Sequence, residues 1–436
     1  MKKLICLLIA LILVSSVFAE INPARRAFEL GIDALVGLSN NYFTLGDIFT
    51  EEIVLDFNDM SDKLTNSGLR LDLNLATNLY FNVNIKNKFT TGIFARVEGD
   101  GYGAIPKAII DFIANGNTLD KAKDGTFGLG TNIFAVFGAS FGTHFGPEVH
   151  PITFKITPNY FMPLIHAPSP SGGFSFVANS DGSMKGQIDT TFSVYTPFSI
   201  ANGFNFDFPS LLKSGGLDLS IEAEYPLLKV LDLGVLVTNL PLKPAQLKYE
   251  MRVHYAGSVE LAEGGLIGTF ADKFNTSSGS SEGGSEGEGE SGSSIATTTT
   301  TPSGEIVSFN TTSKSYYRPF KIGFQAAYRP LKSEILILKP ILQFKFNDPN
   351  SRYTGMFRSK NFDMEFGIRA ETWLMNMIGL ALDLYRANAV WTQELDFAFN
   401  VRVFELDIIF GGQSANIWKS FAGSGVYGGV AIKLGL

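Results

Sequence analysis

The four histidines are the side chains of this sequence best suited to metal or acid–base chemistry. His144 and His150 bracket the segment Phe-Gly-Pro-Glu-Val, whereas His166 and His254 are isolated. A metal site needs several ligands held together, and nothing nearby completes a set around the first pair. The pattern favours two incidental histidines in a turn, so we expect no metal.

Nucleophilic catalysis has as little support in the sequence. A hydrolase needs a nucleophile, a base and an orienting acid within hydrogen-bond reach of one another. No serine elbow of the hydrolase type accompanies the histidines. We therefore expect a protein that is not an enzyme and that uses no cofactor.

The N-terminal residues have the pattern of a secretion signal. Two lysines after Met1 precede an apolar run from Leu4 to Val14, and small residues lead to Ala19. This predicts a signal peptide at 1–19, because the run is shorter than the roughly 20 apolar residues of a spanning helix. The one cysteine, Cys6, lies inside it, which excludes disulfides from the mature chain.

Composition narrows the class of protein further. The chain has 35 basic and 42 acidic residues, and this balance argues against nucleic acid as a partner. Its residues are 45% hydrophobic, yet no later stretch approaches the length of a spanning helix. An apolar chain without such a stretch has to meet lipid in another way.

Apolar and polar residues alternate along the chain, and this pattern indicates strands with one face toward lipid. From Leu69 to Ile85, apolar side chains occupy nearly every odd position, and Arg, Asp and Asn occupy most even ones. Period two is the pattern of a strand and not of a helix. The run also exceeds the roughly 5–6 residues of a typical soluble strand and suits a tilted membrane strand.

Similar runs recur to the end of the chain. They predict an all-β fold, a transmembrane antiparallel β-barrel over 28–436 with about 14 strands (roughly 12 to 16 allowed) and small helical loop insertions. Charged residues within the runs, such as Arg369 and Lys433, should face the lumen. The further candidate strands are 28–38, 88–98, 127–141, 151–160, 187–196, 217–225, 229–240, 246–257, 316–329, 335–346, 361–372, 377–387, 392–404, 405–412 and 426–436.

Three connections between the strands have a character of their own. Residues 104–115 read as a short amphipathic helix with a proline in its first turn and Gly116 beyond its end. Residues 161–185, rich in proline and glycine, predict an irregular loop. The Ser/Gly/Glu tract at 276–304 predicts a disordered extracellular loop, because it cannot bury a core.

A motif after the expected cleavage site suggests a family. Ile21-Asn22-Pro23-Ala24 resembles the Asn-Pro-Ala signature of FadL-type outer-membrane transporters of long-chain fatty acids and other hydrophobic compounds. Diverged phrases at 38–41 and 226–241, and the overall length, also resemble that family. The resemblance implies a 14-strand barrel, an N-terminal hatch and an exit sideways through the wall. Only two residues precede the motif, so 20–27 would form a short remnant of the hatch.

Three functions remain open at this point: uptake of long-chain fatty acids or other small hydrophobic compounds, general diffusion as a porin, and display of loops as a surface antigen or adhesin. We expect an integral outer-membrane protein with surface-exposed loops, whose partners are membrane lipid, the outer-membrane assembly machinery and a hydrophobic small molecule. Apolar side chains on the predicted helix and proline-rich loop predict a luminal ligand site near the outer rim, although the same residues could form a cap instead. They are Ile105, Ile109, Ile110, Phe112, Ile113, Phe161, Phe174 and Phe176.

Overall fold

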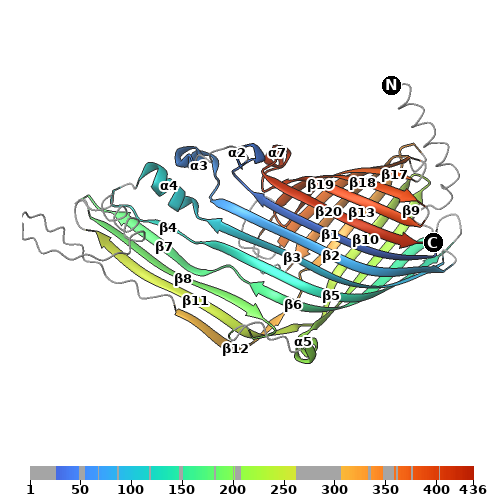
Figure 1. Cartoon of the computed structure of the whole chain (residues 1–436), viewed down its shortest axis with the longest axis horizontal. Helices are drawn as coiled ribbons and strands as arrows, with labels where there is room; N and C mark the ends of the chain where they lie inside the picture. The colour runs from blue at the N-terminus through green and yellow to red at the C-terminus, as the bar shows by residue number, and fades with distance from the viewer. Residues whose placement is uncertain are drawn as a thin grey trace, which may run out of the picture.

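Fourteen antiparallel strands close into one barrel, which confirms the predicted architecture (Figure 1). The computed structural model describes residues 26–48, 55–66, 68–85, 88–116, 119–146, 151–180, 183–199, 201, 208–261, 306–331, 335–346, 358–359, 362–374, 377–401 and 403–436. In ring order the strands are β1 (Phe28–Asn40), β2 (Leu69–Ile85), β3 (Phe89–Ile105), β5 (Gly128–Phe145), β6 (Ile152–Ala167), β9 (Gly216–Leu228), β10 (Leu231–Lys243), β13 (Phe320–Tyr328), β14 (Ile337–Phe346), β16 (Phe362–Leu374), β17 (Ile378–Ala387), β18 (Val390–Val401), β19 (Phe404–Ser414) and β20 (Gly425–Gly435). Pairing of β1 with β20 closes the ring.

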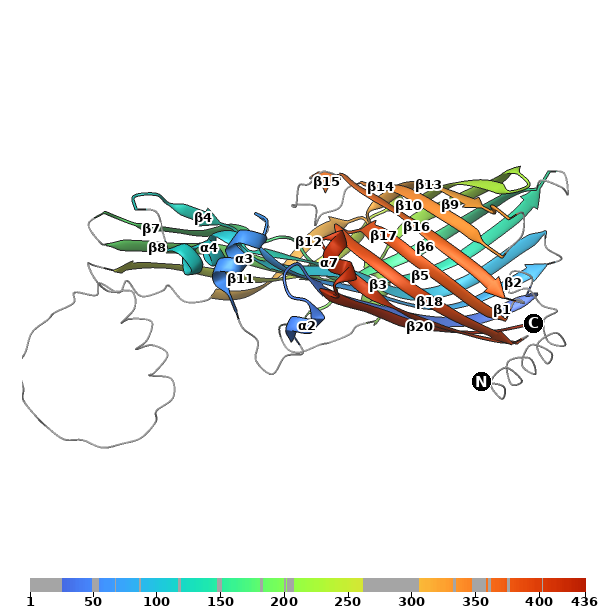
Figure 2. The same cartoon turned by 90° about the horizontal axis from the view of Figure 1, so that it is seen from above.

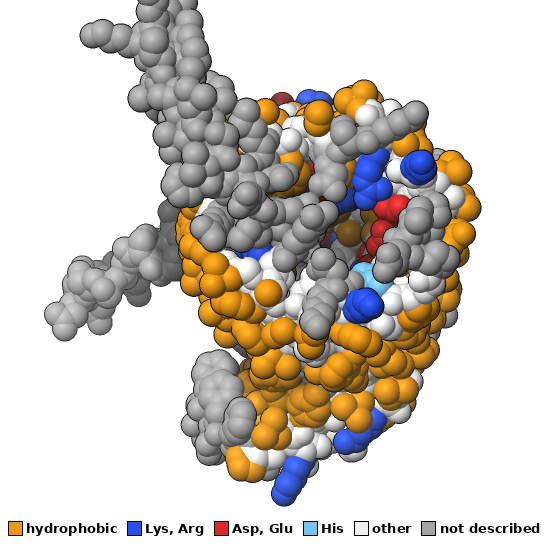
Figure 3. Space-filling model, turned by 90° about the vertical axis from the view of Figure 1, so that its right-hand side faces the viewer, with side chains coloured by type: hydrophobic (Ala, Val, Ile, Leu, Met, Phe, Trp, Pro, Cys, Tyr) orange, Lys and Arg blue, Asp and Glu red, His pale blue; other side chains and the backbone are white. Residues whose placement is uncertain are grey.

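The alternation seen in the sequence separates the two faces of the wall. On β2, Leu71 is 55% exposed on the outside, whereas Arg70 and Asp72 beside it are buried on the inside. Figure 3 shows the result, an apolar outer surface around an opening that contains charged side chains. An apolar exterior on a closed sheet is the arrangement that lipid requires, so the barrel is transmembrane.

The two rims of the barrel differ in the length of their connections. At the rim where β1 begins and β20 ends, β9 and β10 are joined by two residues, 229–230. At the opposite rim, 106–127 join β3 to β5 and 168–215 join β6 to β9. Short turns at one rim and long loops at the other are typical of bacterial outer-membrane barrels.

A second set of strands projects from the long-loop rim (Figures 1 and 2), and we call it the side sheet. It joins the barrel where His166 of β6 pairs with Tyr195 of β8. The prediction of an irregular loop at 161–185 is therefore wrong. The prolines only interrupt a strand direction that continues from β6 into β7. The side sheet consists of β4 (Lys123–Gly125), β7 (Ser171–Ala178), β8 (Met184–Thr196), β11 (Ala245–Leu261) and β12 (Ile306–Tyr316), and a short β15 (Arg358–Ser359) pairs with β16.

Short helices lie in the long connections. α4 (Lys107–Asn115) begins after Pro106 and ends at Gly116 with φ 69°, as the sequence predicts. It packs on α3 (Phe57–Lys63), beside which it lies in Figure 2. The other described helices are α2 (Leu45–Ile48), α5 (Phe208–Ser214) and α7 (Ile417–Phe421). None of the described helices has the length and apolar content needed to cross a membrane.

Candidate functional site

A polar cavity of about 770 Å³ lies inside the barrel, and we call it the chamber. Its wall comes from strands on both sides of the ring and is rich in charged and amide side chains. Figure 3 shows the opening and the acidic and basic side chains within it. Residues that line it include Tyr80, Phe94, Arg96, Glu98, Lys155, Asn159, Arg318, Lys321, Lys345 and Tyr385.

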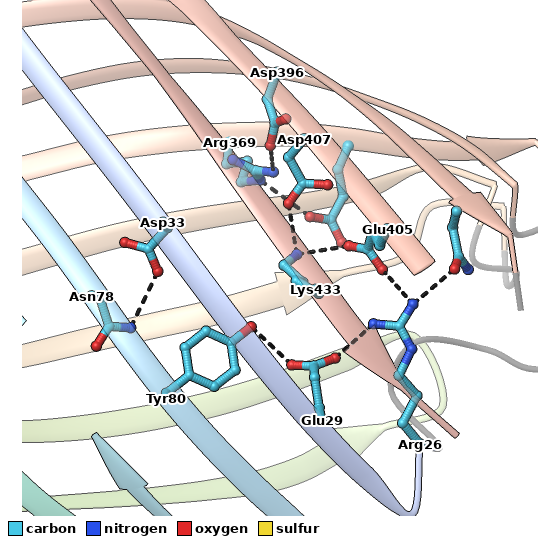
Figure 4. Close-up of polar contacts among 12 residues, drawn as sticks. Arg26, Glu29, Asp33, Asn78, Tyr80, Arg369, Asp396, Glu405, Asp407 and Lys433 are labelled. Carbon is cyan, nitrogen blue, oxygen red and sulfur yellow. Dashed lines mark hydrogen bonds and ion pairs between the residues drawn. The ribbon is translucent and has the colours of Figure 1, made fainter. Parts of the chain in front are cut away.

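An ion-pair network lies on the luminal side of the contiguous strands from β18 through β20 and β1 to β2, near the rim that carries the chain ends (Figure 4). Arg26 reaches Glu405 at 3.0 Å, Glu29 at 2.8 Å and the amide oxygen of Asn400 at 2.8 Å. Tyr80 donates to Glu29 at 2.9 Å. The side chains of Arg26 and Glu405 are 1% and 3% exposed, so the charges are neutralised by each other and not by water.

A second network lies on the luminal side of β16 to β20. Arg369 contacts Asp383 and Asp396, both at 2.7 Å, and Lys433 contacts Asp407 at 2.6 Å. Figure 4 shows Arg369 and Lys433 turned inward. The prediction that these two residues face the lumen is therefore confirmed.

The backbone ladder between β5 and β6 shifts its register between Ile133 and Phe134, and further along it is interrupted at a place where the register is kept. Gly138 pairs with Asn159 and Phe141 with Ile156, but the two intervening pairs are missing. Pro158 stands opposite Ala139 there and has no N–H to donate. The wall therefore lacks a hydrogen bond at this place, which we call the break.

An apolar groove of about 750 Å³ lies against the outer face of the break. Ala139 and Pro158, one of the missing pairs, line this groove, whereas Ser140 and Thr157, the other missing pair, line the chamber. Tyr80, Phe94 and Asn159 line both cavities. The other groove residues include the lipid-facing Leu30, Leu79, Phe81, Ile93, Phe137 and Leu217.

Gly138 makes room for the side chains that the two cavities share. A Cβ at this position would come within 2.3 Å of the Phe94 ring and 2.6 Å of the Asn159 amide oxygen. That amide oxygen is buried and has no hydrogen-bond partner among the described atoms. Only glycine leaves this space, which lies next to the interruption of the backbone ladder.

Arg318 crosses the lumen on the side of the long loops. It lies in the connection between β12 and β13, and its side chain is 2% exposed. The guanidinium contacts Glu98 of β3 at 2.5 Å and Asp218 of β9 at 2.9 Å. These contacts span the segment of wall that contains the break.

The apolar residues predicted as a ligand site are divided between separate clusters. On α4, Ile110 is buried against α3, Ile109 is half-buried and Ile113 is 52% exposed, and Ile105, at the end of β3, is 45% exposed. Phe112 packs on Phe176 with ring centroids 4.3 Å apart, and Phe174 stacks on Phe176.

Phe161 lies elsewhere, in a buried cluster with Phe134, Val136 and Leu247 where the side sheet joins the barrel. The structure therefore does not bring all the predicted residues together, and ligand contact by the α4 residues stays a prediction. The signal peptide 1–19, the motif residues Asn22, Pro23 and Ala24, and the tract 276–304 lie outside the described residues.

The described histidines have ordinary hydrogen-bond partners. His144 contacts Thr153 at 2.9 Å, His166 contacts Asn132 at 2.8 Å, and His254 contacts an aspartate at 3.1 Å. His150 lies outside the described residues. Within the part of the chain that the structure describes, no group of three His, Cys, Asp or Glu residues could hold a metal ion.

Sequence reasoning did not single out the residues that shape the two cavities. One available signal was Pro158, because a proline within an alternating run marks a position where a ladder hydrogen bond is lost. Arg318 gave no such signal. Its partners lie 220 and 100 positions away in the chain.

Comparison with known proteins finds one matching family model and several similar solved structures. Residues 25–218 match a family of unknown function, DUF5723. No curated protein matches the sequence. The fold is similar to that of the Ralstonia pickettii toluene transporter TbuX, with a TM-score of 0.43 and 10% identity over 96% of this chain and 93% of that one.

Two further solved structures have TM-scores and sequence identities close to these values. The Pseudomonas putida toluene transporter TodX has a TM-score of 0.41 and 9% identity over 94% of this chain and 89% of its own. A Pseudomonas aeruginosa FadL homologue has a TM-score of 0.40 and 9% identity, over 95% and 92%. At such low identity no residue can be carried over, so we take function from the geometry of the chamber and the groove.

The buried Arg26 network predicts a large loss of stability when it is broken. Arg26→Ala would remove one of the two cations that contact the buried Glu405 carboxylate, the other being Lys433 at 2.7 Å, and breaking a buried ion pair typically costs up to about 3–5 kcal/mol. The free energy of unfolding in lipid vesicles, from urea titration, measures this loss. Lys63→Ala, which removes the solvent-exposed ion pair with Asp59, is the control and should leave the urea midpoint unchanged. Equal midpoints for the two variants would contradict the structural role of Arg26.

Proposed function

We propose that this protein is an outer-membrane transporter that takes up small amphipathic molecules, long-chain fatty acids being the best-fitting class. The molecule would enter the chamber from outside and leave sideways into the membrane between β5 and β6. The observation that carries this proposal is the pair of cavities on the two sides of the break, polar within and apolar without, which share Tyr80, Phe94 and Asn159.

The two cavities suit the two ends of such a molecule: the groove has apolar surroundings for the tail, and the chamber has charged and amide side chains for the head group. Each methylene that moves from water into the apolar groove gains about 0.8 kcal/mol. Inside the chamber, Lys155 is exposed on the inner face of β6 and has no ion-pair partner among the described residues. Its ammonium suits a carboxylate head group, because a charged partner strengthens a hydrogen bond.

The break provides a direction for release. Separating β5 from β6 costs less at the break than elsewhere along this ladder, because one ladder hydrogen bond is already absent beside Pro158. The apolar groove would then receive the tail without exposing it to water.

A general diffusion porin is the second candidate, favoured by the charged and amide side chains that line the chamber. Single-channel conductance of the refolded protein in planar bilayers separates the two functions. A lateral transporter whose lumen is crossed by ion pairs should conduct very little. A steady open-channel current would favour the porin and contradict the proposed route.

The lateral route predicts that restoring the missing hydrogen bond reduces uptake. Pro158→Ala supplies an N–H opposite Ala139, and one added hydrogen bond of about 1 kcal/mol should lower uptake of a fluorescent fatty acid about fivefold. Pro340→Ala is the matched control, because Pro340 interrupts the β13–β14 ladder in the same way but lines neither the chamber nor the groove. Equal uptake by the Pro158 variant and the wild type would contradict lateral exit.

A carboxylate site at Lys155 predicts a head-group-dependent loss of affinity. Lys155→Gln should weaken binding of dodecanoate about tenfold, since hydrogen bonds to charged groups contribute about 1.5–3 kcal/mol. Binding of dodecanol, which has the same tail without the charge, should be unchanged in the variant. Fluorescence titration of the purified barrel measures both, and an equal loss for acid and alcohol would exclude a charge-specific role.

A further inference from the structure

The connection that carries Arg318 joins the side sheet to the barrel wall and is fixed at both ends. Before it, Tyr316 is buried in the junction cluster with Phe134 and Leu247. After it, the carbonyl oxygen of Pro319 accepts a hydrogen bond from the Asn239 side chain at 2.9 Å. A side chain on so short and anchored a connection has a defined position in the lumen.

From this position Arg318 reaches the break through one intermediate residue. Its guanidinium donates to one carboxylate oxygen of Asp218 at 2.9 Å, and the other oxygen accepts from the amide of Asn159 at 2.8 Å. Asn159 follows Pro158 and lines both cavities. The order of contacts is therefore Arg318, Asp218, Asn159 and then the break.

Electrostatic attraction holds Arg318 and Asp218 together. The side chains of Arg318 and Asp218 are each 2% exposed, so each needs the other as a counter-charge. Glu98 supplies the second carboxylate on the guanidinium, and it also contacts Arg96 at 3.0 Å. Arg318 is thus shared between two carboxylates that belong to opposite sides of the break, on β3 and on β9.

We propose that Arg318 is the positioning residue of the lateral opening and couples loading of the chamber to release. This rests on the proposed function. With Arg318 paired to both Glu98 and Asp218, the two sides of the break are bridged, Asn159 is held against Asp218 beside it, and the opening stays narrow. A carboxylate head group that enters the chamber, which Arg318 lines, competes with Asp218 for the guanidinium. Asp218 and Asn159 are then released, and the wall opens for a molecule that carries the charge.

The coupling predicts a preference for the charged head group that depends on Arg318. Cells that express the full chain should take up dodecanoate about tenfold faster than dodecanol, as expected for a charge-assisted contact. With both probes at saturating concentration, so that binding at Lys155 does not limit the rate, the ratio in Arg318→Gln should fall to about one, because the opening no longer responds to a carboxylate. Arg318→Lys keeps the charge and should retain most of the preference.

The ratio of dodecanoate uptake to dodecanol uptake distinguishes a positioning role of Arg318 from a role in folding, because a misassembled barrel would lose uptake of both probes together. Heat-modifiable gel mobility shows whether each variant has folded. Asp218→Asn, which keeps the side-chain shape, provides a second route to the same loss of preference if Arg318→Gln does not fold. An unchanged ratio in the folded variants overturns the role of Arg318 and leaves lateral transport standing, whereas a wild type that takes up neither probe overturns both.

Discussion

Every backbone N–H and C=O of a membrane strand has to find its partner in a neighbouring strand, because lipid offers none. In this protein the constraint is met by closure, since β1 pairs with β2 on one side and with β20 on the other. A place where a backbone hydrogen bond between two strands is missing is therefore informative. Pro158 removes one donor from the β5–β6 ladder, and the wall has cavities on both sides there. The functional proposal depends on this local defect because, unlike the similar interruption at Pro340, it lies between two cavities.

The lumen obeys a second constraint, which concerns charge. Alternation sends polar side chains inward, and the interior of a narrow barrel has little water to solvate them. The structure pairs these charges between neighbouring strands, as Arg369 does with Asp383 and Asp396, and across the closing seam of the ring, as Arg26 does with Glu405. These networks occupy part of the lumen and leave the chamber beside them. A polar interior is thus compatible with an apolar cargo, provided that the cargo has a polar head and a way out through the wall.

The side sheet shows how an insertion can act on the barrel. It grows from β6 at the long-loop rim, and its last strand returns to the wall through the connection that carries Arg318. The residue that crosses the lumen therefore belongs neither to a barrel strand nor to a free loop. Its place is fixed by the buried cluster around Phe161 and Leu247, so packing where the side sheet joins the barrel determines which charges meet in the lumen.

The sequence by itself determined the barrel, because strand period and apolar exterior are local properties. The run Leu69–Ile85 could be placed to the residue, and the helix after Pro106 could be placed from its flanking proline and glycine. Local signals failed at 161–185, where prolines indicated a loop and strand pairing with β8 imposed a sheet. They also could not show that Phe161 packs apart from Phe112 and Phe176. Which inward side chains meet across the lumen depends on ring closure and register, which bring together residues hundreds of positions apart, and only the tertiary structure decides that.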